Sequence, residues 1–409
     1  MSAIKNGSSE LFKDSLTEMT DLALAAGLHP IKQIKQNLRV IDPAFLIGAG
    51  KRMELTNLIQ ELQPQYVIFD HVLSGVQTRN LEKQFNISVF DRNQLILEIF
   101  ASRARSHEGK LQVQLAQLLD QMPRMTGAWL GSLSRQGGKL GAKGPGEKAL
   151  EVDRRRAREK IRHIKGQLKK VSRARQQRRT RRKKMQVPSF ALIGYTNSGK
   201  SALLNRLTNS RVETKNQPFM TLDPTTRKVF IPGMSTAVVT DTVGFIRHLP
   251  HHLIEAFKAT LEEAAQADIL LHVIDRACPF MNRNISVVND LIEELGWQNK
   301  PLLYVFNKSD LPPSERNLTL SPKYQPRAII SAKTGDGIEK LLNQMKSVVE
   351  NLKQSAELYF PKEKEHEVYN LSRETEIQRT EAGRFGSVCV TQMTTQQMAE
   401  WKDHIISKD

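Results

Sequence analysis

Residues 194–201 read Gly-Tyr-Thr-Asn-Ser-Gly-Lys-Ser, and this stretch decides the fold. It fits the phosphate-loop pattern G-x-x-x-x-G-K-[ST] and follows an apolar run, residues 190–193, that is typical of a β-strand. The two glycines let backbone N–H groups turn inward around a phosphate, Lys200 can reach the terminal phosphates, and the Ser201 hydroxyl can bind Mg²⁺. The pattern predicts a nucleotide-phosphate site. Its expected residues are Gly194, Asn197, Ser198, Gly199, Lys200, Ser201 and Ala202.

Three further motifs each follow a run that we expect to be a parallel strand. D-x-x-G at residues 241–244 puts Asp241 where it can hold Mg²⁺ through water and the Gly244 N–H where it can sense the γ-phosphate. N-K-x-D at residues 307–310 suits guanine, because a carboxylate accepts from both the ring N–H and the exocyclic amine, donors that adenine does not offer together. S-A-K at residues 331–333 can close over the base edge. The residues expected at the base are Asn307, Lys308, Asp310, Ser331, Ala332 and Lys333.

The order of these motifs predicts the fold class. The expected strands before the last three motifs are residues 236–240, 302–306 and 328–330. Motifs at the C-terminal ends of parallel strands meet at one edge of a sheet, where ligands of open α/β sheets bind. The sequence therefore predicts an α/β P-loop GTPase domain with GTP and GDP as ligands and Mg²⁺ as the metal.

Composition points to a reduced, intracellular protein of several domains. At 409 residues the chain is long enough for two or three domains with cores of their own. Its two cysteines, Cys278 and Cys389, are in neither a metal nor a redox spacing. No stretch is long and apolar enough to span a bilayer, and acidic residues interrupt residues 1–27. We expect a cytoplasmic protein with no transmembrane segment and no secretory signal.

The formal net charge of +18 is concentrated in one segment. Residues 151–186 hold seventeen lysines and arginines against three acidic residues, a net +14. Only Gly166 interrupts a helical pattern there, and a helix tolerates it. Four apolar residues recur at spacings of three and four and share one face. They are Ile161, Ile164, Leu168 and Val171.

This basic helix is expected to bind a polyanion. Charge of nearly one sign repels itself, so a polyanionic partner is favoured over a merely solvated face. An anionic membrane surface is the competing partner, which would make the protein peripherally membrane-associated, but the apolar stripe carries neither Trp nor Phe and so favours RNA. The candidate RNA contacts are Arg154, Arg155, Arg156, Arg173, Arg175, Arg178, Arg179, Arg181 and Arg182.

The segment before the basic helix is patterned as a separate α/β unit. Residues 66–70 and 87–91 are short apolar runs typical of strands, with helical patterns around them. A glycine-rich stretch, residues 137–147, leads into the basic helix. Two interpretations of that stretch stand side by side, a loop that contacts phosphate or RNA and a hinge between domain and helix.

The chain resembles the HflX-type GTPases, a ribosome-associated group among the translation-factor-related GTPases. The motifs that carry the resemblance are Phe69-Asp70-His71 and residues 106–113, 144–147, 222–226 and 241–247. The resemblance implies an N-terminal domain with a long helical arm, a GTPase domain and a small C-terminal α/β domain. It also implies binding to the large ribosomal subunit and, as for some members, splitting of stalled ribosomes. Lys148-Ala149 stands where the family pattern has Thr-Gln, which counts against a second, ATP-type activity of the N-terminal region.

We therefore expect four parts. They are an N-terminal α/β domain at residues 1–110, a helical arm with the glycine-rich loop and basic helix at 111–187, a P-loop GTPase domain at 188–351, and a small C-terminal α/β domain at 352–409. In the last part, residues 387–390 are typical of a strand, and Thr394 is expected to cap a helix. We expect a monomer.

The first switch should lie between the phosphate loop and D-x-x-G, at residues 219–225. It must place a threonine hydroxyl on Mg²⁺ and its N–H on the γ-phosphate. By resemblance to related GTPases with F-x-T-L-x-P, Thr221 is the expected residue, and Thr225 is the alternative. Lys200, Thr221 and Gly244 are then the expected catalytic residues.

Two positions bear on the rate of hydrolysis. Many GTPases place a water-orienting glutamine directly after the D-x-x-G glycine, whereas this chain has Phe245, which cannot hydrogen-bond water. Intrinsic hydrolysis should therefore be slow and need a partner, for which the ribosome is the natural candidate. Asn197 resembles the asparagine that helps to bind K⁺ in some related GTPases, with a loop-stabilising amide as the alternative.

These observations leave two classes of function. One is a GTPase that binds the large ribosomal subunit and ribosomal RNA, is stimulated by the ribosome, and splits or rescues stalled ribosomes. The other is a GTP-gated switch on RNA or membrane without splitting activity. Dependence of GTP turnover on the ribosome separates the two.

Overall fold

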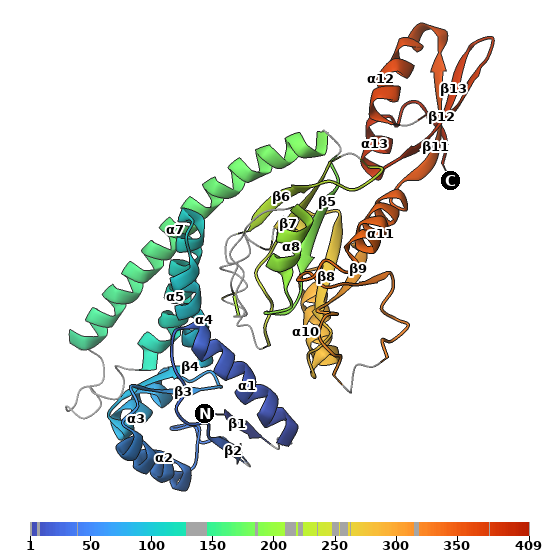
Figure 1. Ribbon diagram of the computed structural model, residues 1–409. Helices are drawn as coiled ribbons and strands as arrows, with labels where there is room; N and C mark the ends of the chain where they lie inside the picture. Colours follow the sequence, from blue (N-terminus) through green and yellow to red (C-terminus); the bar gives the residue numbers. More distant parts are fainter. Residues whose placement is uncertain are drawn as a thin grey trace.

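The computed structural model shows a mixed α/β protein, as predicted, with three bodies along the chain (Figure 1). An N-terminal body carries a long helical arm, a central six-stranded sheet follows, and a small four-stranded sheet ends the chain. The structure describes residues 2–5, 9–38, 40–127, 145–184, 187–208, 218–219, 224–234, 236–247, 253, 261, 263–314, 319–375 and 377–408.

The N-terminal body alternates short strands with helices. Its elements are β1 (Ser2–Lys5), α1 (Ser9–Ala25), β2 (Lys35–Leu38), α2 (Ala49–Leu62), β3 (Tyr66–Phe69), α3 (Gly75–Phe85), β4 (Ser88–Asp91) and α4 (Arg92–Arg103). The pairs β1–β2 and β3–β4 are parallel, and the two strands predicted from the apolar runs are confirmed as β3 and β4. Capping boxes at Ser74 and Asp91 begin α3 and α4. Asp91 therefore ends a strand and caps the next helix.

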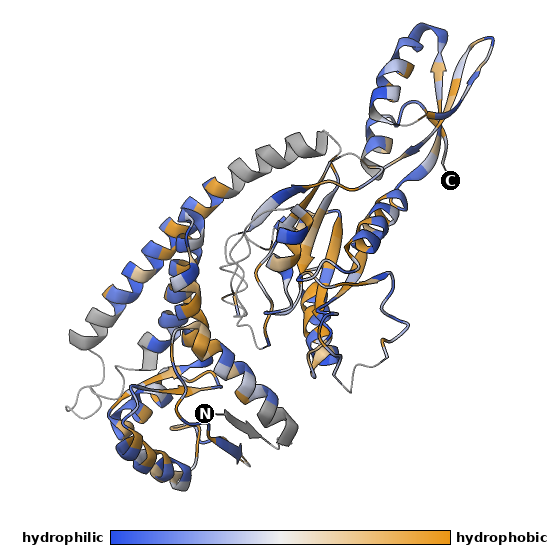
Figure 2. Ribbon diagram, in the orientation of Figure 1, coloured by the Kyte–Doolittle hydropathy of each residue, from blue (hydrophilic) through white to orange (hydrophobic). Residues whose placement is uncertain are grey.

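The helical arm is built from α5 (His107–Gly127) and α7 (Pro145–Lys184), which lie side by side (Figure 1). The predicted basic helix is confirmed as α7, which at 40 residues is roughly 60 Å long. Pro145 suits a first helical turn, where its missing N–H has no partner to lose. Ile161, Ile164 and Leu168 are buried in one core cluster with residues of α5, and Figure 2 shows apolar residues of α7 where it passes α5. Three of the four residues of the predicted apolar stripe are thus covered from within the protein, and the fourth, Val171, is half-buried.

The central body is an open twisted sheet with helices on both faces (Figure 1). Its strands are β5 (Ser189–Ile193), β6 (Thr225–Val229), β7 (Ala237–Asp241), β8 (Ile269–Asp275), β9 (Leu302–Asn307) and β10 (Arg327–Ile329). Its helices include α8 (Lys200–Thr208), α10 (Met281–Glu294) and α11 (Ile338–Glu350). The strand order is β10-β9-β8-β5-β7-β6, and only β6 runs antiparallel to its neighbour. The carboxyl ends of β5, β7 and β9 therefore meet at one edge, as the motifs predicted (Figure 2 shows the apolar strands between the helices).

The C-terminal body is a small antiparallel sheet with helices. Its elements are β11 (Gln354–Pro361), the 3₁₀ turn η2 (Lys362–Lys364), α12 (His366–Glu374), β12 (Ile377–Ala382), β13 (Gly386–Met393), α13 (Thr395–Glu400) and β14 (Ile405–Lys408). The sheet order is β12-β13-β11-β14. Thr394 caps α13 by accepting from the N–H of Gln397 and forms a capping box with it, so the predicted cap is confirmed.

The N-terminal and central bodies share a hydrophobic core. Phe100 of α4 meets Phe219 edge to face, with ring centroids 4.6 Å apart. Val243 and Ile246, in and just after the D-x-x-G motif, belong to the same buried cluster. Phe219 begins the predicted first switch and takes a left-handed φ of 55°, a conformation that bulky residues rarely adopt. Phe219, at the start of the predicted first switch, and the D-x-x-G segment are thus packed against the N-terminal body.

Candidate nucleotide site

The phosphate loop joins β5 to α8 and requires both of its glycines. Gly194 and Gly199 have φ of 151° and 92°, in the region that favours glycine. A Cβ on Gly194 would collide with the carbonyl oxygen of Val273, and one on Gly199 would collide with Nδ2 of Asn307. The backbone therefore approaches its neighbours closely at these two points and curves around the start of α8. A helix N-terminus there favours an anion.

Lys200 lies inside the loop, with 6% of its surface exposed. Its Nζ donates to the carbonyl oxygens of Gly194 and Tyr195, both at 3.0 Å. Burial lowers the pKa of Lys200 to about 8, although the Asp241 carboxylate opposes this by favouring the charged form. A bound phosphate would add a second anionic partner and restore the ordinary charge of this lysine.

Ser201 and Asp241 are in direct contact at the predicted metal position. Ser201 Oγ donates to Asp241 Oδ2 at 2.6 Å, which joins the start of α8 to the end of β7. A hydroxyl and a carboxylate oxygen are hard ligands of the kind that Mg²⁺ prefers, usually together with water and substrate phosphates. The two side chains thus fit a magnesium ion held by Ser201 directly and by Asp241 through water.

The D-x-x-G segment lies against the phosphate loop. The N–H of Phe245 donates to the Gly194 carbonyl at 3.0 Å, and the N–H of Thr196 donates to the Phe245 carbonyl at 2.8 Å. A Cβ on Gly244 would lie 2.9 Å from Cγ2 of Thr196 and 3.1 Å from Nζ of Lys200, so only glycine fits. The Phe245 side chain is 2% exposed and packs in the core with Ile193. Phe245 is therefore a core residue that offers no group to orient a water.

Asn307 links two loops at the end of the site where the base is expected. Its Nδ2 donates to the Ser198 carbonyl and its Oδ1 accepts from the N–H of Ala332, each at 2.9 Å. Asn307 thereby joins the phosphate loop to the S-A-K loop. The Ser331 hydroxyl donates to Asp310 Oδ1 at 2.7 Å, and this hydrogen bond lowers the pKa of Asp310. Asp310 is thus held as an ionised acceptor, which is what a guanine N–H requires.

Lys308 and Asn197 complete the part of the site that the structure describes. Lys308 has a φ of 65°, and its Nζ pairs with Asp275 at the end of β8 at 2.7 Å. Asn197 takes a left-handed φ of 63° on the phosphate loop. Thr221 lies outside the described residues. Thr225, the alternative, begins β6 and pairs with Asp241 across the sheet.

Three family models match consecutive parts of the chain. "GTP-binding GTPase N-terminal" matches residues 13–101, and "GTP-binding GTPase Middle Region" matches residues 103–182. "50S ribosome-binding GTPase" matches residues 189–308, which hold the phosphate loop, D-x-x-G and the first half of N-K-x-D.

Whole-length relatives agree with these matches. The GTPase HflX of Lacrimispora saccharolytica is 46% identical over 352 residues, which cover 86% of this chain and 82% of that protein. The GTPase HflX of Escherichia coli strain K12 is 44% identical over 334 residues, 81% of this chain and 78% of that protein. The chain belongs to the HflX family of GTPases. A crystal structure of a GTP-binding protein from Sulfolobus solfataricus in complex with GDP is 24% identical, covers 86% of this chain and 99% of that chain, and has a TM-score of 0.44.

As a member of the HflX family, the chain binds GTP and hydrolyses it. The resemblance predicted from the motifs is thereby confirmed. In the described ranges, no helix combines the length and apolarity that crossing a bilayer would need.

The candidate RNA-binding arginines lie along α7. Arg155 and Arg156 are exposed, and Arg154 is half-buried. Arg155 Nε pairs with Glu159 at 3.1 Å, and Arg156 Nη1 lies 3.8 Å from Asp153, so two of the three acidic residues of the segment lie beside arginines. The other six arginines are in the described part of the helix, but their side chains are not among the described ones. They are Arg173, Arg175, Arg178, Arg179, Arg181 and Arg182.

Sequence reasoning missed contacts that support the HflX site, made by Arg206, Tyr195 and Glu18. Arg206 of α8 donates to carbonyl oxygens of the S-A-K loop, at Ala332 and Lys333. Tyr195 occupies a variable position of the phosphate-loop pattern, yet its hydroxyl contacts Glu18 of α1. No local pattern marks Arg206 or Glu18, because their partners are more than a hundred residues away in the sequence.

Proposed function

We propose that this GTPase binds the large ribosomal subunit, hydrolyses GTP with ribosome stimulation, and thereby splits or rescues stalled ribosomes. The observation that carries the proposal is α7, with a net charge of +14 over residues 151–186 on a helix roughly 60 Å long. A strip of arginines on that scale matches ribosomal RNA, which carries a phosphate at every nucleotide. The match of residues 189–308 to the 50S ribosome-binding GTPase model supports the same partner.

The packing of α7 favours RNA over a membrane surface. An amphipathic helix binds lipid by burying its apolar face in the headgroup region. Ile161, Ile164 and Leu168 are instead buried against α5 and the core of the protein. Among the described side chains of α7, Val152 is exposed and Val171 is half-buried. The rest of its described surface is mainly polar and basic, which suits phosphate better than lipid. We propose a cytoplasmic monomer that meets the ribosome through this arm.

The described side chains support a mechanism for phosphoryl transfer. Lys200 would neutralise the terminal phosphates, Ser201 and Asp241 would hold Mg²⁺, and the Gly244 N–H would bind the γ-phosphate. When held by Ser201 and Asp241, Mg²⁺ would supply positive charge that offsets the negative charge developing on the leaving group. Asn307, Lys308 and Asp310 would select guanine, with Ser331, Ala332 and Lys333 closing the base edge. We assign the remaining contact to the switch threonine, Thr221 or Thr225.

The need for an activator follows from Phe245. Its side chain is buried and cannot orient water, so the position after D-x-x-G lacks the group that many GTPases use there for that purpose. A ribosome that orders the switch segments would position the attacking water in its place. Asn197 is the candidate ligand for K⁺, and replacing K⁺ by Na⁺ in the hydrolysis assay separates this role from that of a loop amide.

The proposal is tested by binding and by gradient profile. The full-length protein, loaded with GDP or with a non-hydrolysable GTP analogue, is pelleted with purified large subunits, and intact ribosomes are resolved on sucrose gradients. We expect tighter binding with the analogue and conversion of intact ribosomes to subunits. Tight binding without conversion would support a GTP-gated switch that does not split ribosomes, and binding to anionic vesicles instead of subunits would support the membrane alternative.

We keep the four-part division as a proposal. The parts are residues 1–110, 111–187, 188–351 and 352–409. The first boundary lies within α5, which begins at His107. A truncation that separates the first two parts should therefore cut before this helix.

A further inference from the structure

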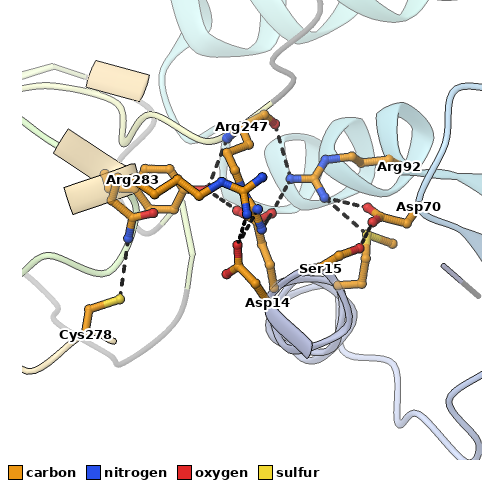
Figure 3. Close-up of polar contacts among 11 residues, drawn as sticks. Asp14, Ser15, Asp70, Arg92, Arg247, Cys278 and Arg283 are labelled. Carbon is orange, nitrogen blue, oxygen red and sulfur yellow. Dashed lines mark hydrogen bonds and ion pairs between the residues drawn. The ribbon is translucent and has the colours of Figure 1, made fainter. Parts of the chain in front are cut away.

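The helix α1 of the N-terminal body touches the phosphate loop through a buried polar network (Figure 3). Arg247, just beyond the D-x-x-G motif, pairs with both Asp14 and Glu18 of α1. Arg92 pairs with Glu18 and with Asp70, each at 2.7 Å, and donates to the Arg247 carbonyl at 3.2 Å. Arg283 of α10 joins at Asp14, at 2.8 Å. The network therefore links the N-terminal body to the GTPase core at the catalytic end of the sheet.

The Tyr195 hydroxyl is the point where three segments meet. It donates to Oε1 of Glu18 and accepts from the backbone N–H of Arg247 at 3.1 Å. Tyr195 is the second residue of the phosphate loop, and its own carbonyl accepts from Lys200 at 3.0 Å. Burial raises the pKa of Tyr195, so its hydroxyl stays protonated and available as a donor. One side chain therefore connects α1, the phosphate loop and the segment after D-x-x-G.

Glu18 is itself held firmly. Its other carboxylate oxygen accepts from Arg92 at 2.7 Å and from Arg247 at 2.8 Å. Burial would raise the pKa of Glu18, but Arg92 and Arg247 outweigh this and lower it, so the carboxylate remains charged. A charged group with two arginines and a phenol around it has little freedom to turn. It is a fixed anchor for Tyr195.

The outer side of the phosphate loop is not closely packed against α1. Between α1 and the loop there is a cavity of about 300 Å³, lined among others by Thr17, Asn197 and Ser198. Discrete polar contacts therefore hold the loop to the N-terminal body at this point. The Tyr195 ring also packs against the hydrophobic cluster that the N-terminal and central bodies share. Removing one polar contact would therefore let its hydroxyl shift locally, and with it the carbonyl that positions Lys200.

We propose that Glu18 is a positioning residue of the nucleotide site, which holds Tyr195 and so keeps the phosphate loop in the shape that retains GDP. A preformed cradle loses less conformational freedom on binding than a loose one, so nucleotide leaves it more slowly. Displacement of the N-terminal body would withdraw Glu18 from Tyr195 and speed the release of nucleotide. The N-terminal body thereby sets the lifetime of the bound state.

Release of a fluorescent GDP analogue from the full-length protein, chased with excess GDP, tests this. Tyr195→Phe removes one oxygen and keeps the ring, and Glu18→Gln keeps the size of the side chain. We expect each variant to release GDP faster by roughly five- to fiftyfold, within the usual range of coupling between sites. The rate of a single turnover of prebound GTP should change less than the rate of GDP release does, because the bound triphosphate itself holds the Lys200 ammonium in place. The double variant should accelerate release by less than the two single effects combined, since Glu18→Gln weakens the same acceptor that Tyr195→Phe no longer uses.

A matched control separates positioning from general loosening. Asp120→Asn alters a buried carboxylate of α5, in the helical arm that the N-terminal body carries, and its arginine partner, Arg124 at 3.0 Å, lies on the same helix. GDP release should be unchanged in this variant. Equal acceleration by Asp120→Asn, additive effects of the two test substitutions, or unchanged release from Tyr195→Phe in a protein with a normal melting temperature would each overturn the proposal. If Glu18→Gln does not fold, Tyr195→Phe decides alone.

Discussion

Arg206 Nε donates to the carbonyl oxygen of Ala332 at 3.1 Å, which ties the helix at the phosphate loop to the loop expected at the base edge. Arg206 Nη2 also donates to the Lys333 carbonyl. We expect Arg206→Met to weaken GDP binding by about tenfold, because two donors that hold the S-A-K loop would be lost. Hydrolysis of saturating GTP should change little. Equilibrium titration with GDP checks this, with Arg227→Met, an exposed arginine of β6, as the control. Equal losses in both variants would contradict a specific role for Arg206.

Asp310 should decide the choice of base. Its carboxylate is kept ionised by the Ser331 hydroxyl, so it is ready to accept from guanine. Asp310→Asn should shift preference from guanine to xanthine nucleotides, because the xanthine carbonyl needs a donor. Competition between GDP, XDP and ADP measures the shift, and the unaltered protein should prefer GDP to ADP by orders of magnitude. Comparable ADP and GDP affinity would show that N-K-x-D has been misinterpreted here.

Substitutions at Lys200 and Ser201 should impair nucleotide binding, whereas substitution of Phe245 should impair stability. Lys200→Ala and Ser201→Ala should abolish productive nucleotide binding, since they remove the phosphate and Mg²⁺ contacts. Phe245→Ala should keep GTP binding but lower the free energy of unfolding by about 3–5 kcal/mol, because it empties a buried ring position. Denaturant melts and GTP titrations of the three variants separate the two effects. A Phe245→Ala protein of normal stability that cannot bind GTP would contradict this division.

The pH dependence of GDP affinity should follow Lys200. Burial lowers the pKa of Lys200 to about 8 in the free protein, and a bound phosphate raises it by adding an anionic partner. The contribution of Lys200 to affinity is therefore fully present below pH 8 and falls as pH rises above it, by up to about tenfold per pH unit. Titrations between pH 7 and 10 at constant Mg²⁺ check this. A flat profile over that range would mean that Lys200 is already unperturbed in the free protein.

Charge on α7 should set the salt dependence of ribosome binding. Replacing Arg173, Arg175, Arg178 and Arg179 by Gln should lower affinity for large subunits. Each lost phosphate contact should also remove about 0.7–0.9 from the slope of log affinity against log salt. Pelleting across a salt series measures both. The control replaces four exposed lysines that are scattered over the surface, which removes the same charge and should leave the slope nearly unchanged. These are Lys32, Lys35, Lys83 and Lys340.

The motifs predicted the nucleotide site because each is local. A phosphate loop, D-x-x-G and N-K-x-D each take their geometry from a strand and the turn after it, and β5, β7 and β9 bring those turns to one edge. The long basic helix was also predictable, because its charge and its apolar spacing lie in one continuous segment. Local sequence patterns were sufficient to predict both features.

Contacts between distant segments were beyond local patterns. Glu18 and Tyr195 are 177 residues apart, and nothing near either one indicates the other. The spacing of Ile161, Ile164 and Leu168 predicted an apolar stripe but not that α5 would cover it. Similarly, nothing in the sequence around Phe219 indicated that it would pack against Phe100. These contacts depend on tertiary packing, which places Phe219 and the D-x-x-G segment against the N-terminal body.

The rate of GTP hydrolysis with and without purified large ribosomal subunits tests the central claim most directly. With Phe245 in place of a water-orienting residue, we expect slow turnover by the protein alone and a saturable rise as large subunits are added. The rise should shrink when the four arginines of α7 are replaced, while GTP binding by the isolated protein stays the same. An equal rate with and without subunits, at concentrations where pelleting shows the protein bound, would contradict a ribosome-stimulated GTPase.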